Sequence, residues 1–159
     1  MSKKMYTYEW AQKTAAITLE VNGHQVYNAE GRFSANDLVF TGNDREIGKN
    51  FLVFGDVKGK TSSTYTRMKN SEDHGIDKDY YDYYCERAKE LGTIGVIVVV
   101  ELNREISENH FVPSYRVLLF KLDDIYRTNI ITANYGTGGM VYWHRNDRIA
   151  EYDIPNDLR

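Results

Sequence analysis

The sequence predicts an α/β fold in which helices flank a central mixed β-sheet. Two segments, residues 8–21 and 77–91, carry apolar side chains at helical spacing. Two apolar runs rich in β-branched residues, 51–58 and 93–102, lie on either side of the second segment. Because a strand, a helix and a strand in succession favour a right-handed crossover between parallel strands, we expect both runs in one sheet.

Length and composition limit the class of protein. The chain has 159 residues, of which 42% are hydrophobic and 27% charged, and this size suits a single domain over residues 1–159. No apolar run approaches the roughly 20 residues of a membrane helix, and the amino terminus is too polar for a signal peptide, so we expect a cytoplasmic protein with no membrane partner. The single cysteine, Cys85, excludes an internal disulfide and a zinc site with paired cysteines.

The first half of the chain predicts one helix and three strands. In residues 8–21 one helical face collects Trp10, Ala11, Thr14, Ala15, Ile17 and Val21, and Gly23 follows as a stop signal. The strands are expected at residues 24–28, 36–41 and 51–58. The last two strands would form a hairpin across a turn-rich connection.

The second half predicts a helix between a polar loop and a buried strand. Residues 59–76 have the composition of a loop, and the helix at 77–91 places Tyr81, Tyr84, Cys85, Ala88 and Leu91 on one stripe. The strand at 93–102 is apolar on both faces, which is typical of a central strand covered on both sides. A polar excursion is expected at 104–113, with further strands at 115–121 and 140–144.

Charged residues interrupt the apolar strand at 51–58. Because side chains alternate between the two faces of a strand, Asp56 and Lys58 lie on one face, about 6 to 7 Å apart along it. Asp37 lies on the adjacent strand of the predicted hairpin and joins them if the register allows. Two carboxylates and a lysine would then converge.

Such a convergence suits the cleavage of a phosphodiester bond. Carboxylate oxygens are ligands of Mg²⁺, for which Mn²⁺ can substitute, and the ion stabilises charge on the phosphate and lowers the pKa of a bound water. A lysine adds a point charge near the attacking water or the phosphate oxygens. The alternative is that Asp56 and Lys58 form the solvated face of an edge strand, although Leu52 and Phe54 on that face are apolar.

Four residues in order along the chain carry a family resemblance. Glu9 in the first helix, Asp37 in ANDLVF, and Asp56 and Lys58 in FGDVKGK, followed by a helix and an apolar strand, resemble the PD-(D/E)XK nuclease superfamily over residues 8–102. This superfamily includes restriction endonucleases and Holliday-junction resolvases. The resemblance implies a restriction-endonuclease-like αβββαβ core, here with a C-terminal β extension.

The resemblance also implies roles for single residues. Metal binding would involve Glu9, Asp37, Asp56 and the carbonyl of Val57, Lys58 would assist catalysis, and Lys78 or Tyr81, early in the second helix, would complete the site. Two positions depart from the commoner pattern: Asn36 replaces the preferred proline, and Asp56 replaces the more frequent glutamate. Glu9 has an alternative explanation, because the helix dipole alone favours an acid in a first turn.

The segment after Lys58 is a candidate nucleic-acid interface. Its cations and hydroxyls, without carboxylates, suit contacts to phosphates; the candidates are Lys60, Ser62, Ser63, Arg67 and Lys69. A flexible surface loop would have the same composition. His74 is a candidate accessory proton carrier or a solvated loop histidine. The segment WHRNDR, residues 143–148, could touch DNA or form the end of a hairpin.

These observations lead to a Mg²⁺-dependent endonuclease that hydrolyses DNA, of restriction, resolvase or phage and mobile-element type. The net charge of −3 does not exclude a DNA partner, because cations can gather in one groove. Cutting both strands of a duplex calls for two active sites, so a homodimer is expected. The alternative is a non-catalytic module that binds nucleic acid or protein and retains a nuclease-like fold.

Overall fold

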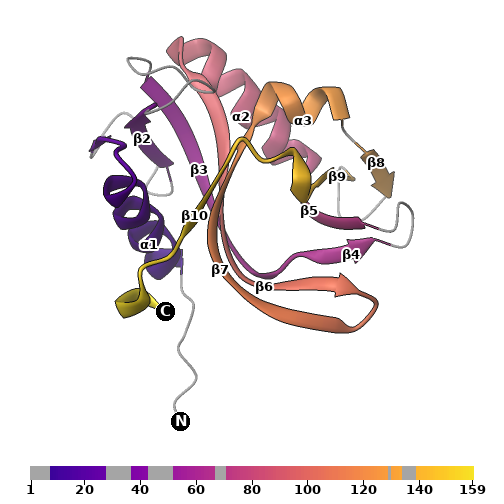
Figure 1. Ribbon diagram of the computed structural model, residues 1–159. Helices are drawn as coiled ribbons and strands as arrows, with labels where there is room; N and C mark the ends of the chain where they lie inside the picture. The colour runs from indigo at the N-terminus through magenta and orange to yellow at the C-terminus, as the bar shows by residue number, and fades with distance from the viewer. Residues whose placement is uncertain (1–7, 28–36, 43–51, 67–70, 129, 134–138) are drawn as a thin grey trace.

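The structure is a computed structural model, and its elements form two sheets and three α-helices within the part of the chain that it describes (Figure 1). The described residues are 8–27, 37–42, 52–66, 71–128, 130–133 and 139–159. The helices are α1 (Tyr8–Val21), α2 (Lys78–Leu91) and α3 (Leu122–Thr128), with short 3₁₀ helices at Arg145–Asp147 and Asn156–Leu158.

The larger sheet has six strands in the order β1-β2-β3-β6-β7-β10. These strands are β1 (Val26–Tyr27), β2 (Asp37–Thr41), β3 (Leu52–Ser62), β6 (Ile94–Ser107), β7 (His110–Lys121) and β10 (Ala150–Asp153). Strands β3 and β6 run parallel, while the other neighbours in this sheet are antiparallel. The prediction of a mixed sheet with β3 and β6 parallel across α2 is therefore confirmed.

A smaller antiparallel sheet has the order β4-β5-β9-β8. Its strands are β4 (Thr64–Thr66), β5 (Ser71–Asp77), β9 (Met140–His144) and β8 (Ile130–Ala133). The prediction of a polar loop at 59–76 is wrong, because β3 runs on to Ser62 beside β6, and β4 and β5 follow. These strands are joined by backbone hydrogen bonds, which form without an alternating apolar pattern, so the sequence gives no strand signal there.

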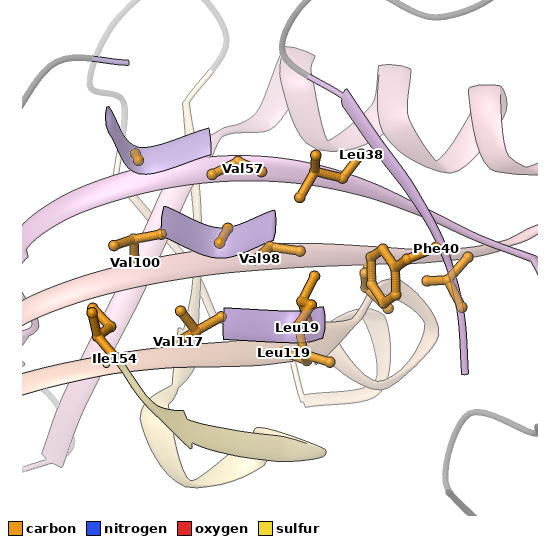
Figure 2. Packing of buried hydrophobic residues seen from close by; sticks show 13 residues of the cluster. Leu19, Leu38, Phe40, Val57, Val98, Val100, Val117, Leu119 and Ile154 are labelled. Atoms are coloured by element: carbon orange, nitrogen blue, oxygen red, sulfur yellow. The ribbon is translucent and has the colours of Figure 1, made fainter. Parts of the chain in front are cut away.

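Two apolar cores lie on opposite faces of the six-stranded sheet. Helix α1 covers one face, and its core is drawn in Figure 2 with side chains from α1, β2, β3, β6, β7 and the segment after β10. Helices α2 and α3 and the smaller sheet cover the other face (Figure 1). We call these the α1 face and the α2 face.

The predicted apolar stripe of α1 is partly wrong. Ala11, Ala15 and Leu19 are buried, while Val21, the last residue of the predicted stripe, is 65% exposed. Helix α1 packs closely on the sheet at Ala11, because a Cβ added at Gly59 of β3 would lie 3.2 Å from the Cβ of Ala11.

Helix α2 follows its predicted stripe. Tyr81, Tyr84 and Ala88 are buried in the core of the α2 face, and Cys85 and Leu91 pack against it. The helix ends at Gly92, whose φ of 64° lies in the left-handed region that glycine adopts without a steric penalty. The stripe and the stop signal are both confirmed.

The expected polar excursion at 104–113 is instead the outer half of a long hairpin. Strand β6 pairs with β7 as far as Ser107 opposite His110, with register shifts near Asn103 and Ser107. Asn109 in the turn has a φ of 58°, and its backbone N–H donates to the Glu105 carboxylate at 2.9 Å. Residues 106–111 of this hairpin are exposed, so the apolar pattern fades while the backbone ladder continues.

The C-terminal region adds the predicted strand at 140–144, which is β9, together with α3, β8 and β10, which were not predicted. Strand β10 pairs with β7, and Ile154 after it is fully buried in the core of the α1 face. Within the described residues, no helix has the length and apolar content needed to cross a membrane.

Candidate functional site

The candidate site lies where β2 and β3 pair. Asp37 is the direct partner of Asp56 in this antiparallel register. Residues that oppose each other directly in an antiparallel pair are close neighbours on the same face of the sheet. The register that the sequence prediction required is therefore present.

The cores on either side show which face carries Lys58. Leu38 of β2 and Val57 of β3 pack in the core of the α1 face. Because residues alternate along a strand, Lys58, the neighbour of Val57, belongs to the α2 face. The three predicted catalytic residues thus lie on two adjacent strands, with Asp37 and Asp56 paired in the backbone register.

Lys58 shows this orientation directly. Its side chain is half-buried, and its Nζ lies 5.0 Å from the ring centroid of Tyr80 and 5.6 Å from that of Tyr84. Both tyrosines belong to α2. A cation within about 6 Å of a ring centroid is attracted by the negative face of the ring.

The other two predicted metal ligands, Glu9 and Val57, do not present their side chains on the α2 face. Glu9 is exposed in the first turn of α1, on the helix that covers the opposite face, where it lines a shallow pocket with Val26 and Leu38. Val57 lies within the paired strands β3 and β6, and its side chain is buried in the core of the α1 face. The backbone register pairs Asp37 with Asp56, two residues before Lys58, whereas Glu9 lies on the helix that covers the α1 face.

Metal binding by these residues stays a prediction. Among the side chains that the structure describes, no group of three or more histidines, cysteines, aspartates and glutamates could hold a metal ion. That set does not include the carboxylates of Asp37 and Asp56.

The predicted nucleic-acid segment contains one clear correction. Ser63 is fully buried: its hydroxyl donates to the Glu72 carboxylate at 3.0 Å and accepts from the Glu105 backbone N–H at 3.2 Å. A phosphate cannot reach it, so its predicted contact with nucleic acid is wrong. Lys60 and Ser62 lie on β3, and the candidates Arg67 and Lys69 lie outside the described residues.

The two early residues of α2 differ in accessibility. Lys78 is half-exposed, and its ammonium donates to the Asp82 carboxylate at 2.7 Å, one turn along the helix. Tyr81 is buried, and its hydroxyl donates to the Leu122 carbonyl at 3.2 Å. Of this pair, Lys78 alone is accessible to a substrate, and its accessory role stays a prediction.

His74 does not lie in a solvated loop, and that expectation is wrong. It is buried on β5, its Nε2 lies 2.6 Å from Oε2 of Glu101, and its ring meets the ring of Phe120 edge-on. A histidine enclosed in this way has no path to exchange protons with a substrate, so its predicted accessory role is also contradicted.

Glu101 is the centre of a buried polar cluster that sequence reasoning missed. Its carboxylate is fully buried and accepts hydrogen bonds from the Ser114 hydroxyl and from Arg145, whose Nε and Nη2 lie 3.0 and 2.9 Å from Oε1. Arg145 also donates to Glu151 at 2.9 Å. The segment WHRNDR therefore contributes an interior arginine, and its structural reading is the correct one for Trp143 and Arg145, which are both buried.

The pKa of Glu101 reflects competing influences. Burial is the largest and raises the pKa, but hydrogen bonds from His74, Arg145 and Ser114 favour the charged form and together lower it to about 2. Glu101 is therefore held as a carboxylate inside the protein. One signal in the sequence pointed to it: an acid that directly continues the apolar run TIGVIVVV must be buried and paired.

Comparisons with known proteins support the fold. The structure is similar to that of Hjc from Archaeoglobus fulgidus, a Holliday junction resolvase from an archaeal hyperthermophile, with a TM-score of 0.50 and 12% sequence identity. The match covers 93% of this chain and 92% of the resolvase chain. No protein family model matches the sequence, and no curated protein matches it either. The chain therefore has the mixed α/β fold of this resolvase.

Proposed function

We propose that this protein is a divalent-metal-dependent endonuclease that hydrolyses phosphodiester bonds in DNA. The observation that carries the proposal is the register of β2 and β3, which opposes Asp37 directly to Asp56, with Lys58 two residues further along β3. A fold similar to that of a Holliday junction resolvase supports it. Of the functions considered, DNA processing suits these residues and this fold best.

Asp37 and Asp56 suit a hard cation because both carry carboxylates, and the backbone carbonyl of Val57 would add a third oxygen. Mg²⁺, or Mn²⁺ in its place, stabilises charge on a phosphate and lowers the pKa of a bound water. Lys58 provides a positive charge beside the attacking water and the phosphate oxygens. Glu9 would have to reach around the end of the sheet, so it is the least supported ligand of the proposed set.

The proposed substrate is duplex or branched DNA, and the proposed assembly is a homodimer. One active site cuts one strand, so cleavage of both strands of a duplex, or of two strands at a junction, calls for two copies. The similarity to Hjc makes a four-way junction the first substrate to test.

The experiment is a cleavage assay on four labelled substrates: supercoiled plasmid, linear duplex, a four-way junction and RNA. Each is incubated with pure protein in Mg²⁺, in Mn²⁺ and in chelator. We expect cleavage of DNA with either metal and none in chelator. Asp56→Asn and Lys58→Met should each reduce the rate by at least about 100-fold, as removal of a transition-state contact does elsewhere.

A second readout separates binding from cleavage. Mn²⁺ should raise the melting temperature of the wild-type protein by binding the folded state, and this rise should vanish in Asp56→Asn. Cleavage that persists in chelator would contradict the proposed chemistry, and cleavage of RNA alone would overturn the substrate. DNA binding without any cleavage, unaffected by metal, would favour a non-catalytic module.

A further inference from the structure

The environment of Lys58 is built by two tyrosines of α2. Tyr80 and Tyr84 lie four residues apart, one turn along the helix, with ring planes inclined by 15° and centroids 6.3 Å apart. The Lys58 Nζ lies over both rings, at 5.0 and 5.6 Å from their centroids. One lysine from β3 is thus flanked by a pair of nearly parallel rings.

The two rings differ in burial. Tyr84 is buried in the core of the α2 face and makes an edge contact with Tyr83, with centroids 5.7 Å apart. Tyr80 is 52% exposed and extends the same aromatic surface toward solvent. The inner ring is therefore fixed by the core, and the outer ring lies where a substrate would approach Lys58.

A lysine side chain is difficult to hold in one place. Its four-carbon stem is flexible, so fixing the ammonium in one position costs rotamer entropy. Contacts with two ring faces restrict the position of the ammonium, which keeps its positive charge in such a contact.

We propose that Tyr80 and Tyr84 are positioning residues for Lys58: their ring faces hold the ammonium at the edge of the candidate site, ready to meet the scissile phosphate. This inference rests on the proposed nuclease function. The aromatic rings, and not the phenolic hydroxyls, position the ammonium. Tyr80 is the residue to substitute, because its ring is exposed.

The first experiment measures the position of Lys58 without any substrate. Protons above an aromatic ring are shielded, so in protein labelled with ¹³C at the lysine ε carbon the Lys58 signal should lie upfield of the other lysines. Lys58→Arg identifies the signal by removing it. Tyr80→Leu should move it toward the common position, whereas Tyr80→Phe should leave it in place.

The matched control is Tyr83→Leu. Tyr83 is 53% exposed on the same helix and touches Tyr84, so its loss removes a similar exposed tyrosine next to the same buried ring. We expect no change in the Lys58 signal. A wild-type Lys58 signal at the common position, or one unmoved by Tyr80→Leu, would overturn the inference.

The second experiment measures single-turnover cleavage, which separates chemistry from product release. Tyr80→Leu should lower the maximal rate about three- to tenfold, the range of one cation–π contact, with little change in the DNA concentration at half-maximal rate. Tyr80→Phe and Tyr83→Leu should cleave at the wild-type rate. Equal losses in Tyr80→Phe and Tyr80→Leu would assign the effect to the hydroxyl and overturn the inference.

The two experiments distinguish the two proposals. A wild-type protein that cleaves none of the DNA substrates contradicts the proposed function, while the lysine spectrum still decides whether the rings hold Lys58. A shifted Lys58 signal together with a Tyr80→Leu variant that cleaves at the wild-type rate shows that the rings hold the lysine without serving catalysis, and overturns the positioning role.

Discussion

The two faces of the six-stranded sheet bury different kinds of side chain. The α1 face is mostly apolar and buries three polar side chains: Thr14, Thr18 and His24, whose ring packs against Phe40 and Tyr152. The Thr18 hydroxyl donates to the carbonyl of Thr14 within the helix at 2.7 Å. The α2 face holds Lys58 against aromatic rings and, further along, the charged cluster around Glu101. One face thus provides the scaffold, and the other combines packing with fixed charges that could serve chemistry.

The largest expected effect comes from the buried carboxylate of Glu101 on the α2 face. Glu101→Ala removes the acceptor of Arg145 and leaves that buried guanidinium without its main partner. We expect the free energy of unfolding, measured in urea, to fall by about 3–5 kcal/mol. A Glu101→Gln variant, which keeps the shape and one acceptor oxygen, should lose less. A loss below about 1 kcal/mol in Glu101→Ala would mean that solvent reaches this cluster.

A slightly smaller loss should follow from a cavity on the α1 face. Leu19→Ala truncates a fully buried side chain among Phe40 and Leu119 (Figure 2). We expect the free energy of unfolding to fall by about 3 kcal/mol, with the same loss at pH 7 and pH 4, because no charge is involved. A loss that changes with pH would show that a titratable side chain, such as the buried His24 on this face, responds to the cavity.

The charged face should also make the protein sensitive to acid. The pKa of Glu101 is lowered to about 2 from 4.5, so its contribution to stability is complete above pH 4.5 and disappears as the pH falls toward 2. We expect the stability difference between wild type and Glu101→Gln to shrink by about 1–2 kcal/mol between pH 5 and pH 3. Urea unfolding of both proteins across this range measures it. A constant difference would contradict the lowered pKa.

The smallest effect is expected at the position that the sequence pattern misplaced. Val21 is 65% exposed at the end of α1. Val21→Ala should change the free energy of unfolding by no more than about 0.5 kcal/mol, in contrast to Leu19→Ala on the same helix. A loss comparable to that of Leu19→Ala would mean that Val21 packs in the core, as the predicted stripe required.

The sequence predicted the elements whose patterns are local. Both long helices, the buried strand after α2 and its parallel pairing with β3 follow from apolar periodicity and from the order of elements. The stripe of α1 was only partly right: Ala11 and Ala15 are buried as predicted, but the buried face continues to Leu19, whereas Val21 is exposed. Short polar strands such as β4 were missed because their stability comes from backbone pairing.

The candidate site was predictable only in part. The D-x-K spacing of Asp56 and Lys58 indicated their shared face, and the hairpin prediction indicated that Asp37 would be near. The aromatic partners of Lys58 come from a helix more than twenty residues further along the chain, and periodicity within that helix says nothing about which strand it touches. Arg145 lies still further from Glu101, so only the tertiary fold could pair them.

The hairpin of β2 and β3 also bears on the order of events during folding. Asp37 and Asp56 are brought together by a comparatively local pairing, whereas β6 reaches β3 only after two more strands and a helix have been added to the chain. Local contacts close with a smaller entropy cost and form sooner than distant ones. The pairing of Asp37 with Asp56 would thus form early in folding. The contacts of Lys58 with Tyr80 and Tyr84 would form later, when α2 packs on the sheet.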